Sequence, residues 1–174
     1  MSDKKIKQNN NINKFKKNNT GFTIIELLIV LGISIILATA AAPLYGSLQV
    51  SAQLNENSSL IIQSLRTARE RSIAGYNNIQ HGVFFDINTG AVDSYTLYQG
   101  SSYVARQTAY DRFITLDEPL SFSSNGFIMI GEDVDINFST GIGRPNNAGI
   151  IILSHQVSGN RSIEVNYAGK IEEN

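Results

Sequence analysis

The chain has 174 residues, a formal net charge of −1 at neutral pH and no cysteine. Without cysteine it has no disulfide, thiolate nucleophile or cysteine-ligated metal site. The small net charge hides an asymmetry, because six lysines and one acid lie in residues 1–21, whereas residues 22–174 hold eight basic and fourteen acidic residues. This acidic balance disfavours a phosphate-binding surface, so nucleic acid is not the expected partner.

A membrane-length apolar run follows the lysine-rich leader. Residues 22–42 hold one charged side chain, Glu26, and as a helix they span roughly 31 Å, enough to cross a bilayer. Because basic flanks stay in the cytoplasm, we predict one crossing, with the N-terminus cytoplasmic and the chain beyond Pro43 extracytoplasmic. A removed export signal is an alternative, since Ala38-Thr39-Ala40 has the form of a signal peptidase site, but the apolar run is longer than a signal requires.

Glu26 argues against a removed export signal. A carboxylate inside a membrane segment costs about 2.5 to 3.5 kcal/mol, so a partner for it is expected. If the chain were cut between Gly21 and Phe22, the new ammonium of Phe22 would neutralise Glu26 of its own or of a neighbouring chain, and the second pairing would drive assembly. Alternatively, Glu26 lies near the headgroup boundary and reaches water.

The sequence around this boundary, Lys16-Lys17-Asn18-Asn19-Thr20-Gly21-Phe22-Thr23-Ile24-Ile25-Glu26-Leu27-Leu28, closely resembles the class III leader and N-terminal methylation motif of type IV pilins and pseudopilins. The resemblance implies that a prepilin peptidase cleaves after Gly21 and methylates Phe22. It also implies that Glu26 is the assembly glutamate, with other pilin or pseudopilin subunits and an inner-membrane assembly platform as partners. Pro43 falls where many pilins carry a helix-kinking proline.

Beyond Pro43 the helical pattern continues. Leu54, Ile61, Leu65 and Ala68 fall on one face at 100° per residue, and Gly75 is the expected stop. We therefore predict one helix over residues 22–74, bent near Pro43, with two helices joined by a hinge as the alternative. The predicted segments are a leader (1–21), a transmembrane half-helix (22–42), an amphipathic half-helix (43–75) and a β-rich head (76–174).

From residue 77 onward, short β-type runs alternate with turn residues. A hairpin is expected over residues 81–98, with its turn at residues 86–90, and further strands at 113–116, 120–122, 127–130, 135–138, 150–154 and 162–165. One face of an antiparallel sheet should bury the apolar stripe of the helix. The predicted fold class is α+β and pilin-like, with a long N-terminal helix packed on a β-sheet head.

Three stretches of the head give a narrower resemblance. Residues 65–74, followed by a strand, and residues 136–145 and 163–171 resemble the GspH/FimT group of minor pilins and pseudopilins. Some DNA-binding members end in a Gly-Arg-x-Arg segment, but the corresponding residues here are Gly169-Lys170-Ile171-Glu172, which lack the second basic residue. Residues 99–131 match no known pattern, and loops there are candidates for setting partner choice.

No stretch has the pattern of a catalytic site. His81 and His155 are expected to be structural or surface residues, and Gly141-Ile142-Gly143 is a turn rather than a dinucleotide fingerprint. Residues 132–135 and 86–88 offer oxygen ligands for calcium but do not complete a binding loop, so solvated acids are the better interpretation. No metal or cofactor is predicted.

Together these observations predict a non-enzymatic minor pilin or pseudopilin, a structural subunit of a type II secretion pseudopilus or a type IV pilus. Its expected location is the bacterial inner membrane, and after assembly a periplasmic pseudopilus or a surface pilus. One alternative is a minor pilin for DNA uptake or adhesion. Another is a membrane-anchored extracytoplasmic domain that never polymerises.

Overall fold

A computed structural model describes residues 21–87 and 92–174, with the backbone alone over residues 40–44. The chain divides into two compact units, Met1–Ala42 and Pro43–Asn174, and each is considered by itself. Residues 1–20 of the predicted leader (1–21) and most of the turn predicted over residues 86–90 lie outside the described residues.

A single helix, α1 (Ile24–Ile73), continues from the first unit into the second. The prediction of one helix is therefore confirmed over the alternative of two separate helices. The side chain of Pro43 lies in the stretch described by its backbone alone, so a bend caused by that residue stays a prediction. Within the described part of the chain, no helix is both long and apolar enough to cross a membrane.

The helix ends where the sequence predicts. Gly75 adopts a left-handed conformation with a φ of 62°, which a residue without a Cβ adopts at little cost. A short 3₁₀ helix, η1 (Tyr76–Asn78), then leads the chain to the first strand.

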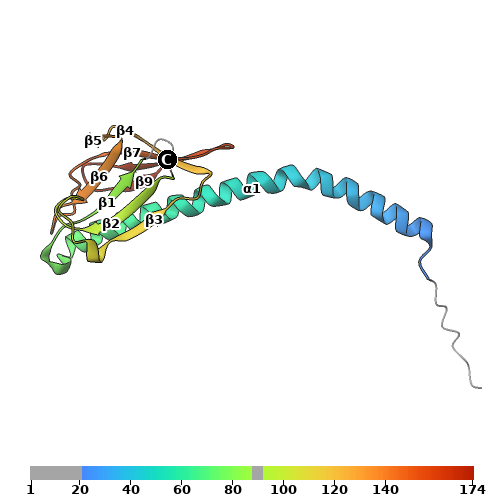
Figure 1. The fold of residues 1–174 in the computed structure, drawn as a ribbon, viewed down its shortest axis with the longest axis horizontal. Coiled ribbons are helices and arrows are strands. Elements are labelled where there is room, and N and C mark those ends of the chain that lie inside the picture. Colours follow the sequence, from blue (N-terminus) through green and yellow to red (C-terminus); the bar gives the residue numbers. More distant parts are fainter. Residues whose placement is uncertain (1–20, 88–91) are drawn as a thin grey trace, which may run out of the picture. The chain divides into compact units, whose positions relative to one another are not determined.

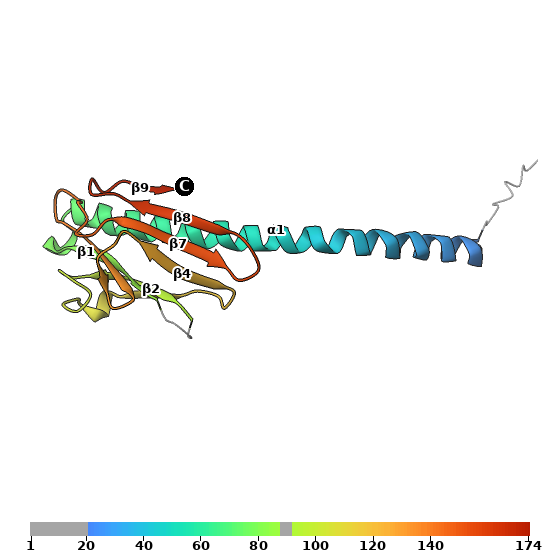
Figure 2. The same ribbon diagram turned by 90° about the horizontal axis from the view of Figure 1, so that it is seen from above.

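The head contains two antiparallel sheets instead of the single sheet expected. The first has the order β3-β2-β1-β6-β5 and the second the order β4-β7-β8-β9. Figures 1 and 2 show both sheets beside the C-terminal half of α1. The strands are β1 (His81–Asp86), β2 (Ser94–Gln99), β3 (Arg112–Thr115), β4 (Leu120–Asn125), β5 (Met129–Ile130), β6 (Asp133–Phe138), β7 (Gly149–His155), β8 (Asn160–Val165) and β9 (Ile171–Glu173).

The predicted hairpin is confirmed, since β1 pairs with β2 in a register that joins His81 to Gln99. The other predicted strands are present, but several of their bounds differ by one to three residues: β4 continues to Asn125, and β6 and β8 each begin two residues earlier than expected. β5 begins at Met129, two residues later than expected, because the backbone of Ile128 is bonded to the side chain of Asn147 and leaves the ladder. β9 was not predicted, because it has only three residues and only Ile171 among them is buried.

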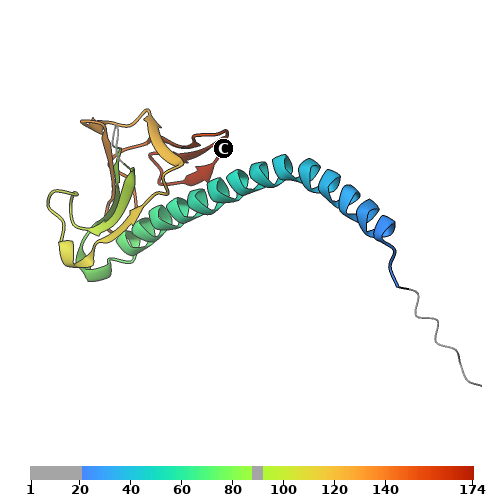
Figure 3. The ribbon, with the colours of Figure 1, turned by 45° about the vertical axis from the view of Figure 1, so that its right-hand side comes forward.

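The core of the head forms where the apolar stripe of α1 meets both sheets. Leu54, Ile61, Leu65 and Ala68 are each at most 1% exposed, so the predicted stripe is confirmed. They pack with inward-facing strand residues such as Val83, Phe85, Ile136, Ile151 and Ile163. Figure 3 shows the C-terminal half of α1 running along the two sheets that supply these residues. Ile73, at the end of α1, is 40% exposed and lies outside this core.

Candidate functional site

The predicted cleavage point lies in backbone that is not helical. Gly21, Phe22 and Thr23 precede α1, and all three are exposed. Thr23 then caps the helix, because the Glu26 amide donates to Thr23 Oγ1 at 3.3 Å and the Leu27 amide donates to the Thr23 carbonyl at 3.1 Å. The peptide bond between Gly21 and Phe22 is therefore separated from the helix by its cap.

Thr23 is a functional candidate that the sequence analysis missed. A threonine followed three residues later by a glutamate is the pattern of a capping box, and Thr23 and Glu26 have this spacing. The spacing of Thr23 and Glu26 is the sequence signal for this cap, although both residues also belong to the stretch that resembles the methylation motif. Glu26 lies in the first turn of α1, where the helix dipole favours an acidic side chain.

The first turns of the helix expose apolar side chains in every direction. Phe22 is 79% exposed, and Ile24, Leu28, Leu31 and Ile35 are all more than half exposed. Within this stretch the Ser34 hydroxyl donates to the Val30 carbonyl at 2.8 Å, so its polar group is satisfied by the helix itself. A helix that is apolar all round requires a covering of lipid or of other apolar elements.

In the head, the three stretches that carry the narrower resemblance come together at the end of α1. Arg69 Nε donates to the Gly143 carbonyl at 3.2 Å, Arg66 Nη2 donates to the Ile171 carbonyl at 3.3 Å, and the Gly141 amide donates to the Ser72 carbonyl at 2.9 Å. The last turns of the helix thus hold both C-terminal loops through their backbone.

Two of the glycines in these loops are required by close packing. A Cβ on Gly143 would lie 2.5 Å from the Ile73 side chain, and one on Gly169 would lie 2.5 Å from the Gly143 carbonyl oxygen. Both residues also have a left-handed φ, of 67° and 80°. The motif residues Gly143 and Gly169 therefore allow the two loops to pack against the end of the helix.

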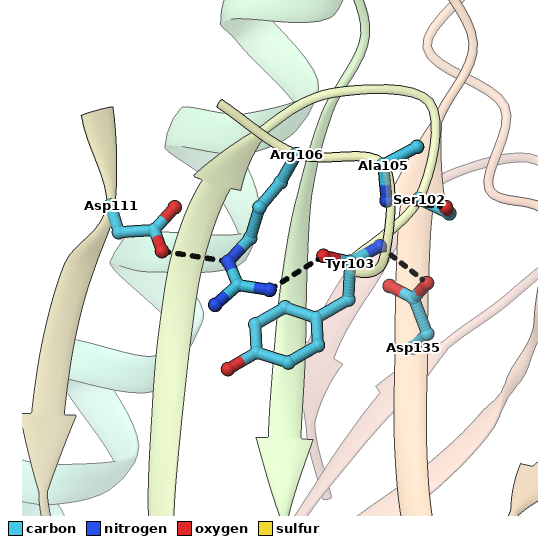
Figure 4. A network of polar contacts seen from close by, with 6 residues as sticks. All are labelled: Ser102, Tyr103, Ala105, Arg106, Asp111 and Asp135. Atoms are coloured by element: carbon cyan, nitrogen blue, oxygen red, sulfur yellow. Dashed lines mark hydrogen bonds and ion pairs between the residues drawn. The ribbon is translucent and has the colours of Figure 1, made fainter. Parts of the chain in front are cut away.

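A second network holds the loop between β2 and β3 on the outer face of the first sheet (Figure 4). The ring of Tyr103 stacks on Phe84 with centroids 3.7 Å apart, and the Arg106 guanidinium lies 3.7 Å from the Tyr103 centroid. Arg106 also donates to Asp111 Oδ2 and to the Tyr103 carbonyl, both at 2.7 Å. The loop is therefore fixed by a stack of three side chains.

Asp135 anchors the same loop from β6. The hydroxyl of Tyr98 donates to Asp135 Oδ1 at 2.6 Å, and the Tyr103 amide donates to Asp135 Oδ2 at 3.2 Å. Burial, followed by the charge of Asp135, raises the pKa of Tyr98 well above its ordinary value. The interpretation of Asp135 as a solvated acid was wrong, since the residue is buried and both carboxylate oxygens accept hydrogen bonds within the head.

Another acid from the stretches considered as calcium ligands also bonds within the head. Asp133 Oδ1 accepts a hydrogen bond from the Ile87 amide at 3.0 Å. Across the described part of the chain, no group of three or more histidine, cysteine or acidic side chains is placed to hold a metal ion.

The two histidines are structural, as predicted. His81 is buried beside the ring of Tyr76, and burial, followed by the charge of Arg71, lowers its pKa below the ordinary value. His155 Nδ1 accepts from the Val157 amide at 3.1 Å, which leaves Nε2 as the donor to Gln53 Oε1 at 3.2 Å. Both ring nitrogens of His155 are therefore engaged within the head.

The segment compared with a DNA-binding ending carries a neutralised cation. Lys170 Nζ forms an ion pair with Glu172 at the start of β9, and both side chains are exposed. Glu172 stands where the DNA-binding segment has its second basic residue. It also pairs with the basic residue that remains, Lys170.

Comparison with known proteins gives one match. Residues 16–42 match the family model of the prokaryotic N-terminal methylation motif, which covers the end of the leader, the predicted cleavage point, Glu26 and the apolar run. No curated protein and no solved structure matches the chain. The matched segment indicates a prepilin-like protein with a type IV pilin-like N-terminus.

Proposed function

We propose that this protein is a prepilin-type subunit that is processed at its N-terminus and assembled into a filament through α1. The observation that carries the proposal is the position of the matched motif. Residues 16–42 contain the turns of the helix whose apolar side chains are exposed all round, together with a single carboxylate. Such a segment needs lipid before assembly and neighbouring helices afterwards.

Cleavage is proposed between Gly21 and Phe22, followed by methylation of the Phe22 amine. The exposure and non-helical backbone of residues 21–23 support this assignment, because a peptidase needs an extended segment to reach the peptide bond. The prepilin peptidase is accordingly a proposed partner.

Glu26 is proposed to pair with the terminal amine of an adjacent subunit. Its pairing within a low-dielectric environment would stabilise the assembled state, since an unpaired carboxylate there is costly. Residues 22–42 are proposed to cross the inner membrane before assembly, a span whose last three side chains lie outside the described part. Pro43 is proposed to bend α1 just beyond it.

The finer assignment is a minor pilin or pseudopilin of the GspH/FimT type, in a type II secretion pseudopilus or a type IV pilus. Its support is the convergence of residues 65–74, 136–145 and 163–171 at the end of α1. The proposed location is the inner membrane and then the filament, with other subunits and the assembly platform as partners. The ion pair of Lys170 with Glu172 favours assembly over nucleic-acid binding.

Two substitutions test processing and assembly separately. Gly21→Ala is expected to block cleavage, so the variant should keep its leader when co-expressed with a prepilin peptidase, as shown by electrophoretic mobility and by the mass of the N-terminal peptide. Glu26→Leu should be cleaved and methylated normally but lost from sheared filaments. Glu56→Leu, which removes an exposed acid further along α1, is the matched control and should assemble.

Normal shortening of Gly21→Ala would remove the proposed cleavage site. Filaments that contain Glu26→Leu at the same level as Glu56→Leu would remove the proposed role of the charge. An unprocessed wild-type chain that stays monomeric in the presence of the peptidase would favour the non-polymerising anchor instead.

A further inference from the structure

β3 is an edge strand whose outer side is open. It pairs with β2 on one side, and no described strand pairs with it on the other. The Leu116 amide donates to the Asp93 carbonyl at 2.9 Å, which sets the phase of the ladder between these strands. Because backbone groups alternate between the two sides of a strand, Ile114 bonds toward β2 whereas the N–H and C=O groups of Phe113 and Thr115 face outward. A further strand would find donors and acceptors here.

The opposite edge of the same sheet is β5, whose two residues offer little backbone for another strand to pair with. Asn147 Oδ1 accepts from the Ile128 amide at 2.9 Å, and Asn147 Nδ2 donates to the Ile128 carbonyl at 2.7 Å. Asn147 lies opposite Ile128 in the register that pairs Asn125 with Ile150, so these bonds continue the pairing of β4 with β7. β3, with four residues, is the longer of the two edge strands of the first sheet.

A cleft of about 100 Å³ lies beside β3, between the strand and α1. Arg112 and Ile114 face the cleft, whereas Phe113, on the other face of the strand, is 64% exposed. The lining combines an apolar floor with polar helix side chains, and consists of Leu60, Gln63, Ser64, Thr67, Tyr95, Leu97, Arg112 and Ile114. A strand added to β3 would direct alternate side chains into this space.

Arg112 gives the cleft a positive charge. It forms no hydrogen bond or ion pair with the described residues, unlike Arg106 and Arg161, which pair with Asp111 and Glu173. It is exposed at the start of β3, in a chain whose residues 22–174 are predominantly acidic. The group that complements it is a carboxylate.

We propose that the outer edge of β3 binds an extended segment of another protein subunit, which adds to the sheet as a strand and places a carboxylate against Arg112. Backbone pairing with Phe113 and Thr115 supplies affinity, and Arg112 selects an acidic residue on the face toward α1. This inference does not depend on cleavage of the leader. It can therefore be wrong while the proposed function is right, and the reverse also holds.

The charge is tested with two fluorescein-labelled peptides of alternating Thr and Val, one with a central Glu and the other with Lys at that position. Binding to the full chain in detergent micelles is followed by fluorescence anisotropy. The Glu peptide is expected to bind more tightly, and Arg112→Glu should reverse the preference, with each change about tenfold. Arg144→Glu, which alters an exposed arginine in a loop of the second C-terminal stretch, is the control and should leave the preference unchanged.

The backbone pairing is tested by Thr115→Pro, which removes an outward N–H without a role in the ladder to β2. Proline is tolerated on an edge strand when its nitrogen faces outward. We expect Thr115→Pro to abolish binding of the Glu peptide. Thr115→Val keeps the N–H and should still bind this peptide. A Glu peptide N-methylated at alternate residues probes the same contact without changing the protein, and it should not bind.

Three results would overturn the proposal. Equal binding of the Glu and Lys peptides to the wild-type chain would remove the role of Arg112. Binding of the N-methylated peptide would show that the peptide does not add to β3 as a strand. Light scattering that shows a dimer of the full chain, converted to a monomer by Thr115→Pro, would assign the edge to a second copy of this chain instead.

Discussion

The apolar residues of the N-terminal segment and those of the head have opposite environments, although α1 contains both. In the first turns of α1, Leu31 is 51% exposed and its neighbours are similarly open. In the last turns, Leu65 is fully buried against two sheets. The head therefore gains its stability within one chain, whereas the apolar N-terminal residues gain none until lipid or another subunit covers them.

The largest effect is expected from removing side-chain volume in the head. Leu65→Ala should lower the free energy of unfolding by about 2 to 5 kcal/mol, because it leaves a cavity between α1 and the sheets. Urea unfolding followed by circular dichroism measures the change. Leu31→Ala removes the same atoms from an exposed position and should change head stability by less than about 0.5 kcal/mol. Equal losses in both variants would contradict the contrast between the two regions.

A smaller effect is expected from the network under the loop that follows β2. Asp135→Ala leaves the Tyr98 hydroxyl and the Tyr103 amide without their acceptor and should cost about 2 to 3 kcal/mol. The released loop should also become open to trypsin at Arg106. Glu172→Ala, which removes an exposed ion pair, is the control and should cost at most about 1 kcal/mol. Unchanged resistance to trypsin in Asp135→Ala would show that the loop does not depend on this carboxylate.

The cap of α1 provides a local test of the N-terminal region. Thr23→Ala should destabilise the first turn by about 1 kcal/mol, because it removes the acceptor for the Glu26 amide. Hydrogen exchange at Glu26 and Leu27 measures the change, and Thr23→Ser should restore protection. Stability of the head should not change in either variant. Faster exchange in Thr23→Ser than in Thr23→Ala would rule out the cap as its cause.

The smallest effect is expected from the buried His81 and is confined to acid pH. Burial and Arg71 lower the pKa of His81 in the folded state, so the unfolded chain binds the proton first. The contribution of His81 to the free energy of unfolding is therefore complete above the unfolded pKa of about 6.5. It is lost as the pH falls toward the pKa of His81 in the folded state. His81→Gln should flatten this part of the stability curve. Parallel wild-type and variant curves below pH 6.5 would exclude His81 as the group.

Much of the fold follows from short-range patterns. The stripe containing Leu54 and Leu65, the stop at Gly75 and the hairpin of β1 and β2 are all local periodicities or turn signals, and all are confirmed. The division into two sheets was not predictable, because strand pairing joins residues far apart in the sequence. β9 was missed for another reason, since it pairs locally with β8 but has only three residues, of which one is buried.

The candidate sites also differ in whether their residues are close together in the sequence. The motif at Gly21, Phe22 and Glu26 is continuous in sequence, and the family match covers it. The cluster around Asp135 is assembled from β2, β6 and a loop, and its residues carry no spacing that would reveal it. Asp135 looked like one acid of a solvated run because its sequence neighbours are acidic, whereas its burial is set by Tyr98 and Tyr103 from elsewhere in the chain.

The stack of Phe84, Tyr103 and Arg106 also has a consequence for sequence divergence. These three side chains anchor the loop, whereas the Val104 side chain is 90% exposed and takes no part in the stack. Substitutions at Val104 and the exposed Ala105 would therefore change what the loop presents without releasing it. The head can in this way acquire new surface chemistry one residue at a time while its architecture stays constant.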